Sequence, residues 1–194
     1  MNRCEMYLFR HAQTKWNLEK RFQGQQDSPL SELGLIQSKK MAQTLETIEP
    51  DIVVTSTLNR AKETARIALE QWGKKREVYE MEELKESAFG AWEGMMIDDV
   101  MRDYPEEFNL HRKSPHLFQM DGIEGYADLQ TRGIKGLKKI AEKHPGKRVV
   151  VVTHGLLLLC ILAGIREIPL ERAREKIAIP DNTEYVRVDW LIDV

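Results

Sequence analysis

Four basic side chains stand at or shortly after stretches of sequence that are typical of β-strands. Arg10 and His11 directly follow an apolar stretch, His154 directly follows a valine-rich one, and Arg60 follows a third by four residues. Charged side chains at a buried strand end are costly unless an anion meets them there. Arginine pairs with phosphate oxygens in bidentate geometry, and a helix N-terminus adds backbone N–H groups and partial positive charge. The pattern predicts a phosphate site; a sulfate or a carboxylate would fit a weaker version of it.

Strand and helix patterns alternate along the chain, and they decide where these side chains lie. Runs rich in Val, Ile and Tyr predict strands at residues 5–9, 51–56, 77–81, 148–153 and 183–190. Helical spacing follows Ser31, which suits an N-cap, as far as Pro50, and further helical patterns cover residues 61–72 and 129–141. This alternation predicts an α/β sandwich with a largely parallel sheet, in which binding sites gather beyond the carboxyl ends of the strands. We therefore expect the four basic side chains at one edge of the sheet.

Length and charge limit the class of protein. The 194 residues suit one domain over residues 1–194, large enough to fold without a metal or a disulfide. A formal net charge of −2 and a pI of about 6.2 exclude the overall basic field by which proteins bind nucleic acid or anionic membranes nonspecifically. The apolar tract at residues 149–165 falls short of the ~20 residues of a membrane span and predicts a strand followed by a buried helix. Neither nucleic acid nor a membrane is expected as a partner.

The cysteines and the remaining histidines carry no metal-binding pattern. Cys4 and Cys160 lie far apart without a Cys-x-x-Cys or Cys/His pairing, which argues against a zinc site and a disulfide framework. The first ten residues lack the features of a secretory signal, so a reducing cytoplasm is the expected location. No motif surrounds His111, His116 or His144, and we expect these three at the surface without a metal role.

Five motifs follow one another in an order that identifies a family. They read YLFRHAQTKWN, RFQGQQDSPLSELG, TSTLNRAKETA, LKESAFGAWEG and VVTHG. Each is weak alone, since short patterns arise often by chance, but together they span nearly the whole chain. The sequence resembles the histidine phosphatase superfamily, in its phosphoglycerate mutase-like branch. The resemblance implies a three-layer α/β/α sandwich with a mixed, largely parallel central sheet, and a metal-independent reaction with no cofactor.

The resemblance also implies a role for each basic residue. His11 attacks phosphorus and carries a phosphohistidine, while Arg10, Arg60, His154 and Asn17 hold the phosphoryl oxygens. A neutral imidazole is a competent nucleophile near pH 7, and phosphoryl transfer needs mainly positioning and charge stabilisation. We expect His11 to donate its other N–H to a backbone carbonyl, and the neighbouring guanidinium groups to disfavour its protonated form.

The family pattern places the proton donor at Glu86. Partial burial should favour its protonated carboxyl, so that it can donate to the leaving oxygen and then activate water. Glu82 and Glu83 are rival candidates, but the spacing from Glu86 to Gly90 and Gly94 matches the family. The further residues expected to contact phosphate or the rest of the substrate are Thr14, Gln23, Gly24 and Gly155.

Two positions depart from the family pattern. Ala12 replaces the Gly that commonly follows the nucleophile, which is tolerable unless that position needs a positive φ. The loop that often reads Gly-Glu-Ser is here Gly122-Ile123-Glu124-Gly125, which removes a hydroxyl near the expected site entrance. Both bear on the substrate, and we expect the residues that read its organic half in a lid region at residues 88–125.

Three functions are compatible with these residues. The favoured one is hydrolysis of phosphomonoesters of small phosphorylated metabolites. The first alternative is a phosphoglycerate mutase, which must shield phosphohistidine from water and favours a more elaborate lid than residues 88–125 provide. The second is a phospholigand-binding module without turnover, which the presence of the complete catalytic set argues against. The sequence leaves the identity of the substrate and a homodimer open.

Overall fold

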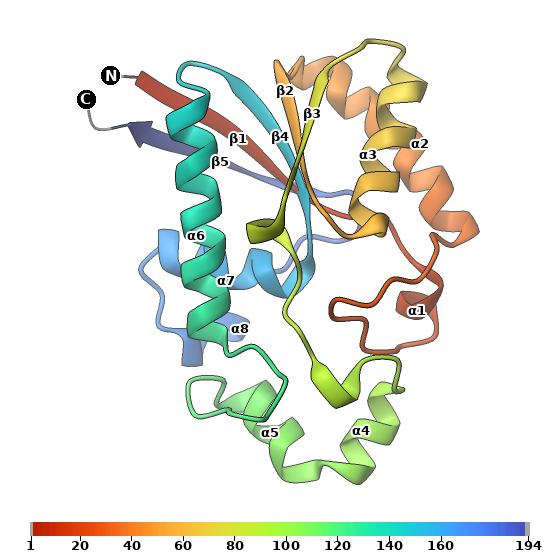
Figure 1. Ribbon diagram of the computed structural model, residues 1–194, viewed down its shortest axis with the longest axis vertical. Helices are drawn as coiled ribbons and strands as arrows, with labels where there is room; N and C mark the ends of the chain where they lie inside the picture. Colours follow the sequence, from red (N-terminus) through yellow and green to blue (C-terminus); the bar gives the residue numbers. More distant parts are fainter. Residues whose placement is uncertain (1, 193–194) are drawn as a thin grey trace.

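A mixed sheet forms the centre of the molecule (Figure 1). The computed structural model describes residues 2–192, and in this part of the chain the strands have the order β3-β2-β4-β1-β5. Neighbours pair in parallel except β5, which is antiparallel to β1. The bounds are β1 Asn2–Arg10, β2 Ile52–Ser56, β3 Glu77–Met81, β4 Arg148–Thr153 and β5 Tyr185–Ile192. Each predicted strand is present, and the predicted fold class is confirmed.

Helices α2 (Glu32–Ile48) and α3 (Asn59–Trp72) cover one face of the sheet (Figure 1). The side chain of Ser31 caps α2 by accepting a hydrogen bond from the N–H of Gly34 at 3.0 Å, as its sequence position predicts. Gly73 ends α3 in the left-handed conformation, with a φ of 74°. The core beneath these helices includes Phe9, Met41, Leu45, Val53, Ala61, Ala65, Val150 and Val152.

Helices α6 (Tyr126–Lys143), α7 (Gly155–Ile165) and α8 (Leu170–Lys176) lie on the opposite side of the sheet. Helix α7 is apolar on every side because the sheet and α6 enclose it, and its residues 155–163 are all buried. A Cβ on Gly133 of α6 would lie 2.6 Å from Cγ1 of Ile161, so the two helices approach as closely as they do only with glycine there. Among residues 2–192, no helix combines the length and the apolarity that crossing a bilayer requires.

The chain between β3 and α6 forms short helices instead of adding to the sheet. They are η1 (Glu82–Leu84), η2 (Gly90–Trp92), α4 (Ile97–Asp103) and α5 (Pro105–Lys113), which lie beyond the carboxyl ends of the strands (Figure 1). We call residues 88–125 the lid segment.

The aromatic core of the lid segment corrects one prediction. His111 was expected at the surface, but it is only 3% exposed. Its ring meets aromatic rings edge-on at 5.2 to 6.1 Å between centroids, from Phe22, Phe89, Trp92, Phe118 and Tyr126. Burial, together with the charges of Arg174 and Arg112, lowers the pKa of His111 to about 3, so the ring packs as a neutral aromatic group. The lack of a sequence motif around His111 therefore did not mean that the residue lies at the surface.

Candidate active site

His11 lies directly after β1 and is 4% exposed. Its backbone N–H donates to the carbonyl of Thr153 at 2.8 Å, which ties the end of β1 to the end of β4. Its ring Nδ1 lies 2.7 Å from the carbonyl of Ala12. A carbonyl can only accept, so Nδ1 carries the proton and Nε2 keeps a free lone pair. The predicted hydrogen bond to a backbone carbonyl is confirmed.

The surroundings of His11 favour its neutral form. Burial lowers the pKa of the imidazole well below its ordinary value, and the positive charges of Arg60 and Arg10 lower it further. The hydrogen bond to the carbonyl of Ala12 acts in the opposite direction but is outweighed. The Nε2 lone pair is therefore available at neutral pH.

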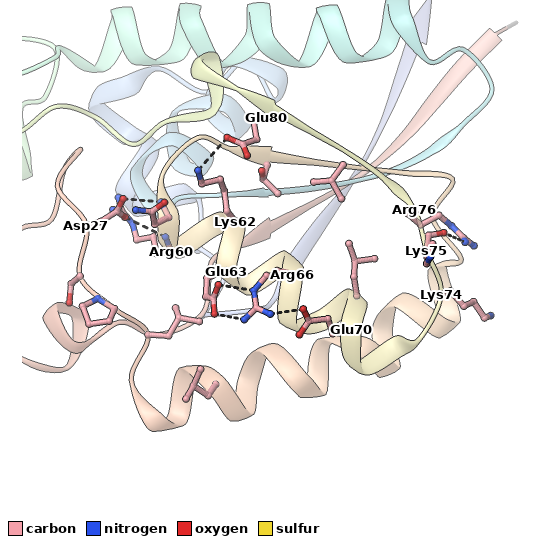
Figure 2. A pocket seen from close by; sticks show the side chains of 18 of the residues that line it. Asp27, Arg60, Lys62, Glu63, Arg66, Glu70, Lys74, Lys75, Arg76 and Glu80 are labelled. Carbon is pink, nitrogen blue, oxygen red and sulfur yellow. Dashed lines mark hydrogen bonds and ion pairs between the residues drawn. The ribbon is translucent and has the colours of Figure 1, made fainter.

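Arg60 lies in the first turn of α3 and is only 2% exposed (Figure 2). Its Nη2 donates to the carbonyl of Gly24 at 2.6 Å, and its Nη1 donates to the carbonyl of Gln26 at 2.7 Å and to Oδ1 of Asp27 at 3.0 Å. The other oxygen of Asp27 accepts the N–H of Asn59 at 2.8 Å, so this carboxylate also caps α3. The sequence analysis missed Asp27 because a capping residue from another loop has no local sequence signal.

Two buried guanidinium nitrogens lack partners inside the protein. Nε of Arg10 and Nε of Arg60 form no hydrogen bond with any other part of residues 2–192. Within residues 2–192, the guanidinium of Arg10 makes a single long hydrogen bond, from Nη1 to the carbonyl of Pro180 at 3.4 Å. Buried polar groups are nearly always hydrogen-bonded, so these free donors are what an incoming anion would satisfy.

His154 is the fully buried N-cap residue of α7, and its ring centroid lies 5.2 Å from that of His11. Its Nε2 lies 2.8 Å from Oγ of Ser56, at the end of β2. Its Nδ1 has no partner elsewhere in the described chain. Burial lowers the pKa of His154 well below the ordinary value, and the charge of Arg60 adds to the effect. Ser56, which was not predicted, orients this ring.

Glu86 is held at the N-terminus of α7. Its Oε2 accepts the N–H of Leu156 at 3.0 Å, and its Oε1 accepts those of Leu157 and Ser87, each at 3.0 Å. Glu86 is 8% exposed. The three backbone donors fix the position of its carboxyl group, which the sequence analysis did not anticipate.

The rival acids face elsewhere. Glu82 pairs with Lys85 at 2.5 Å, and Glu83 pairs with Lys139 of α6. Neither carboxylate lines the cavity that contains His11. Glu86 is thus the acidic side chain that this part of the chain presents to His11.

A cavity of about 180 Å³ gathers the predicted residues at the carboxyl edge of the sheet. Its lining includes the predicted Arg10, His11, Asn17, Gln23, Gly24, Arg60, Glu86 and Gly155. The unpredicted lining consists of Arg21, Phe22, Phe89, Ile97, Leu156 and Ile179, which make one wall largely apolar. The predicted residues other than His154 and Thr14 therefore line one cavity.

Thr14 has a different position from the one predicted. It is fully buried, lies outside the lining of this cavity, and caps α1 (Lys15–Leu18). Its hydroxyl lies 2.8 Å from Oε1 of Gln23, and its backbone N–H donates to Oδ1 of Asn17 at 3.1 Å. Thr14 therefore positions Asn17 and Gln23 and does not itself reach the cavity.

Ala12 fits without strain. Its φ is not among the positive values in residues 2–192, so the position does not require glycine. Its N–H donates to Oγ1 of Thr64 at 3.0 Å, and that hydroxyl donates to the carbonyl of Arg60 at 2.7 Å. This bond ties the loop after His11 to the same turn of α3 that carries Arg60.

A larger cavity, of about 1190 Å³, lies between α3 and β3 (Figure 2). Arg66 on its wall pairs with Glu63 and Glu70, both at 2.5 Å, and Lys62 pairs with Glu80 at 3.4 Å. His11, Glu86 and His154 do not line it. These ion pairs neutralise part of its charge, and the predicted catalytic residues His11, Glu86 and His154 belong to the smaller site.

Other nucleophiles and ligands do not compete with His11. Cys4 and Cys160 are free and buried, and burial raises the pKa of both thiols, which disfavours the reactive thiolate. Among residues 2–192, no three His, Cys, Asp or Glu side chains are grouped as metal ligands.

Comparison with known proteins agrees with this geometry. The family model described as "Histidine phosphatase superfamily (branch 1)" matches residues 6–192. Phosphoserine phosphatase 1 of Hydrogenobacter thermophilus is 35% identical over 83% of this chain and 77% of its own length. A metal-independent phosphoserine phosphatase of Arabidopsis thaliana is 34% identical over 97% of this chain and 79% of its own length.

Further matches extend the comparison. The solved structure of Bacillus stearothermophilus YhfR superposes with a TM-score of 0.88 at 34% identity, over 98% of this chain and 92% of that one. A probable phosphoglycerate mutase of Salmonella paratyphi C is 29% identical over 96% of this chain and 87% of its own length. The chain therefore belongs to the histidine phosphatase superfamily (branch 1) and is a phosphatase.

Proposed function

We propose that this phosphatase hydrolyses small phosphomonoesters through a covalent phosphohistidine on Nε2 of His11. The lone pair on Nε2 forms the N–P bond while the bond between phosphorus and the ester oxygen breaks. The leaving oxygen takes a proton from the carboxyl of Glu86 and departs as an alcohol. The observation that carries the proposal is the free, neutral Nε2 of His11 in a cavity that it shares with Glu86, Arg10 and Arg60.

Water completes the cycle. The carboxylate of Glu86, now deprotonated, accepts a proton as a water molecule attacks phosphorus and the N–P bond breaks. Inorganic phosphate leaves, and His11 and Glu86 return to their starting protonation states. The donors from Leu156 and Leu157 stabilise the carboxylate in the second half of the cycle, when it must be charged.

Arg10, Arg60, His154 and Asn17 are proposed to hold the phosphoryl oxygens. Arg60 is the most firmly positioned, since Gly24, Gln26 and Asp27 already occupy one side of its guanidinium. Its free Nε and that of Arg10 supply donors for the transition-state charge. His154, with its Nε2 at Ser56, supports the group from behind the cavity through Nδ1.

The substrate is proposed to be a small phosphorylated metabolite. A cavity of about 180 Å³ is small compared with the 300–1,000 Å³ of typical ligand pockets. Phosphoserine is a first candidate because two relatives are named as phosphoserine phosphatases. We propose that the chain acts as one domain, whose lid segment contributes Phe89 and Ile97 to reading the organic half.

The proposal includes a metal-independent reaction, a homodimer and a cytoplasmic location. The name of the Arabidopsis relative supports the first. The second is supported by edge strand β3, which within residues 2–192 pairs only with β2 and leaves Val78 48% exposed. The two free, buried thiols support the third. Sedimentation velocity tests the dimer, and activity in EDTA tests the metal independence.

The decisive experiment follows phosphate release from phosphoserine and p-nitrophenyl phosphate in EDTA. Enzyme quenched from the steady state in alkaline detergent should carry phosphate on His11 that is stable in alkali and released in acid. Turnover by His11→Ala at the wild-type rate would overturn the mechanism. Isomerisation of phosphoglycerate much faster than phosphate release would favour a mutase, and phosphate binding without turnover on any substrate would favour a binding module.

A further inference from the structure

Arg132 of α6 lies outside the cavity, yet every N–H of its guanidinium has an acceptor close to Glu86. Nη1 donates to the carbonyls of Glu83 at 2.9 Å and Lys85 at 3.0 Å. Nε and Nη2 donate to the two carboxylate oxygens of Glu124 at 2.8 and 2.6 Å. The remaining hydrogen of Nη2 points to the carbonyl of Glu86 at 3.4 Å. An arginine is the side chain that can supply so many donors in one plane.

Glu124 holds the same stretch of chain from the other side. Its N–H donates to the carbonyl of Ala88 at 3.0 Å, and its carbonyl accepts the hydroxyl of Ser87 at 3.2 Å. The backbone of residues 86–88 therefore lies between the side chain of Arg132 and the backbone of Glu124. Both partners are mostly buried, with side chains 24% and 19% exposed, which limits competition from water.

We propose that Arg132 and Glu124 form a positioning clamp that aims the Glu86 carboxyl at the leaving oxygen. The clamp does not touch the substrate, and neither residue lines the cavity. It fixes the backbone on both sides of Glu86, while the N-terminus of α7 fixes the carboxylate. Proton transfer needs heavy atoms within hydrogen-bond reach, so a backbone shift of about 1 Å is enough to weaken it.

The clamp also joins the lid segment to the acid. Glu124 is the last-but-one residue of the lid segment, and Arg132 belongs to the layer of helices behind the sheet. The Gly122–Gly125 loop was expected at the site entrance, but its carboxylate points away from the cavity to Arg132. Through this pair, the lid segment is therefore linked to the backbone of Glu86.

The test is the dependence of kcat/KM on the leaving group. p-Nitrophenolate leaves without help, whereas the alkoxide of phosphoserine or glycerol phosphate needs a proton. Arg132→Met should lower kcat/KM for the alkyl esters by on the order of 10²-fold or more and for p-nitrophenyl phosphate by less than about 10-fold. Arg132→Lys, with a charge but no planar fork, should give an intermediate result.

A matched control lies on the same helix. Lys139→Met removes a cation that pairs with Glu83 in the same loop but contacts neither residue 85 nor residue 86, so it should leave the leaving-group dependence unchanged. Far-UV circular dichroism and thermal unfolding show whether each variant folds. If Arg132→Met does not fold, Glu124→Gln carries the same comparison, with a smaller loss in the same direction.

This inference rests on the proposed acid role of Glu86, and Glu86→Gln separates the two. Suppose that Glu86→Gln steepens the dependence of kcat/KM on the leaving group, while Arg132→Met lowers kcat/KM equally for every substrate or not at all. The clamp is then overturned, and the acid role of Glu86 is retained. If Glu86→Gln leaves the dependence flat, the proposed acid role fails, and the clamp fails with it.

Discussion

The carboxyl edge of the sheet and the lid segment are built in different ways. At the sheet edge, His11 and His154 directly follow two parallel strands and Ser56 ends a third, so strand pairing fixes their relative positions. The lid segment holds together through an aromatic cluster around His111 and through the clamp at Glu124. The first arrangement depends on backbone hydrogen bonds, the second on side-chain packing. The proposed reaction therefore depends on the topology of the sheet, while the proposed selectivity depends on side chains that substitutions can repack.

The largest effect should come from the nucleophile. His11→Ala should lower kcat/KM by on the order of 10⁴-fold or more, because the other catalytic residues act as one unit with the nucleophile and contribute little without it. Steady-state release of phosphate measures it. His116→Ala, on the exposed surface of the lid segment, is the matched control and should keep the wild-type rate. Comparable losses in both variants would contradict the separation of the two regions.

The next effect should come from Arg60. Arg60→Ala should cost on the order of 10³-fold in kcat/KM, because arginines that stabilise transition-state charge contribute that much in other phosphoryl transfers. Arg66→Ala lies on the same helix but is exposed and paired with Glu63 and Glu70, so it should have little effect. A loss below tenfold for Arg60→Ala would show that it is mainly structural.

The pH dependence of stability tests the buried histidines of both regions. The pKa values of His11, His154 and His111 are lowered in the folded state, the last to about 3, so the unfolded chain binds more protons below about pH 6.5. Their full contribution is present above that pH and is lost as the pH falls. Each of these histidines should lower the free energy of unfolding by up to about 1.4 kcal/mol for each unit by which the pH falls.

Urea unfolding between pH 6.5 and 5.5 measures this loss. His111→Phe should make the dependence on pH shallower, because one of the buried histidines is then missing, and it keeps an aromatic ring in the lid cluster. Stability that stays constant over this range in the wild type would contradict the neutral state of these rings.

The smallest effect should be on selectivity. Ile97→Ala removes three carbon atoms of apolar surface from the lid side of the cavity, and one methylene alone alters discrimination by about 10-fold or more. The ratio of kcat/KM values for phosphoserine and p-nitrophenyl phosphate should shift accordingly. The rate at which water hydrolyses the phosphohistidine should not change. Single-turnover dephosphorylation of the phosphorylated enzyme measures that rate. A change in that step would show that the lid segment takes part in the reaction itself.

Sequence patterns located the strand ends because a strand needs only a short apolar run and because parallel strands share an edge. They located His11, Arg60 and His154 for that reason. They did not find Asp27, Ser56 or Arg132, whose hydrogen-bond partners lie 33, 98 and about 50 residues away along the chain. His111 was wrongly predicted at the surface because histidine is a polar residue type. Its burial depends on aromatic neighbours from other parts of the chain. Contacts of this kind exist only after the chain has folded.

The start of α7 sets the spacing between the proposed proton donor, Glu86, and the proposed phosphoryl site. His154 precedes the helix, and the amides of Leu156 and Leu157, two and three residues later, hold the carboxylate of Glu86. These residues lie in the first turn of a regular α-helix, so helix geometry fixes this interval. Substitutions in the surrounding loops can then change which metabolite binds, while the alignment of the Glu86 carboxyl with the proposed phosphoryl site is kept.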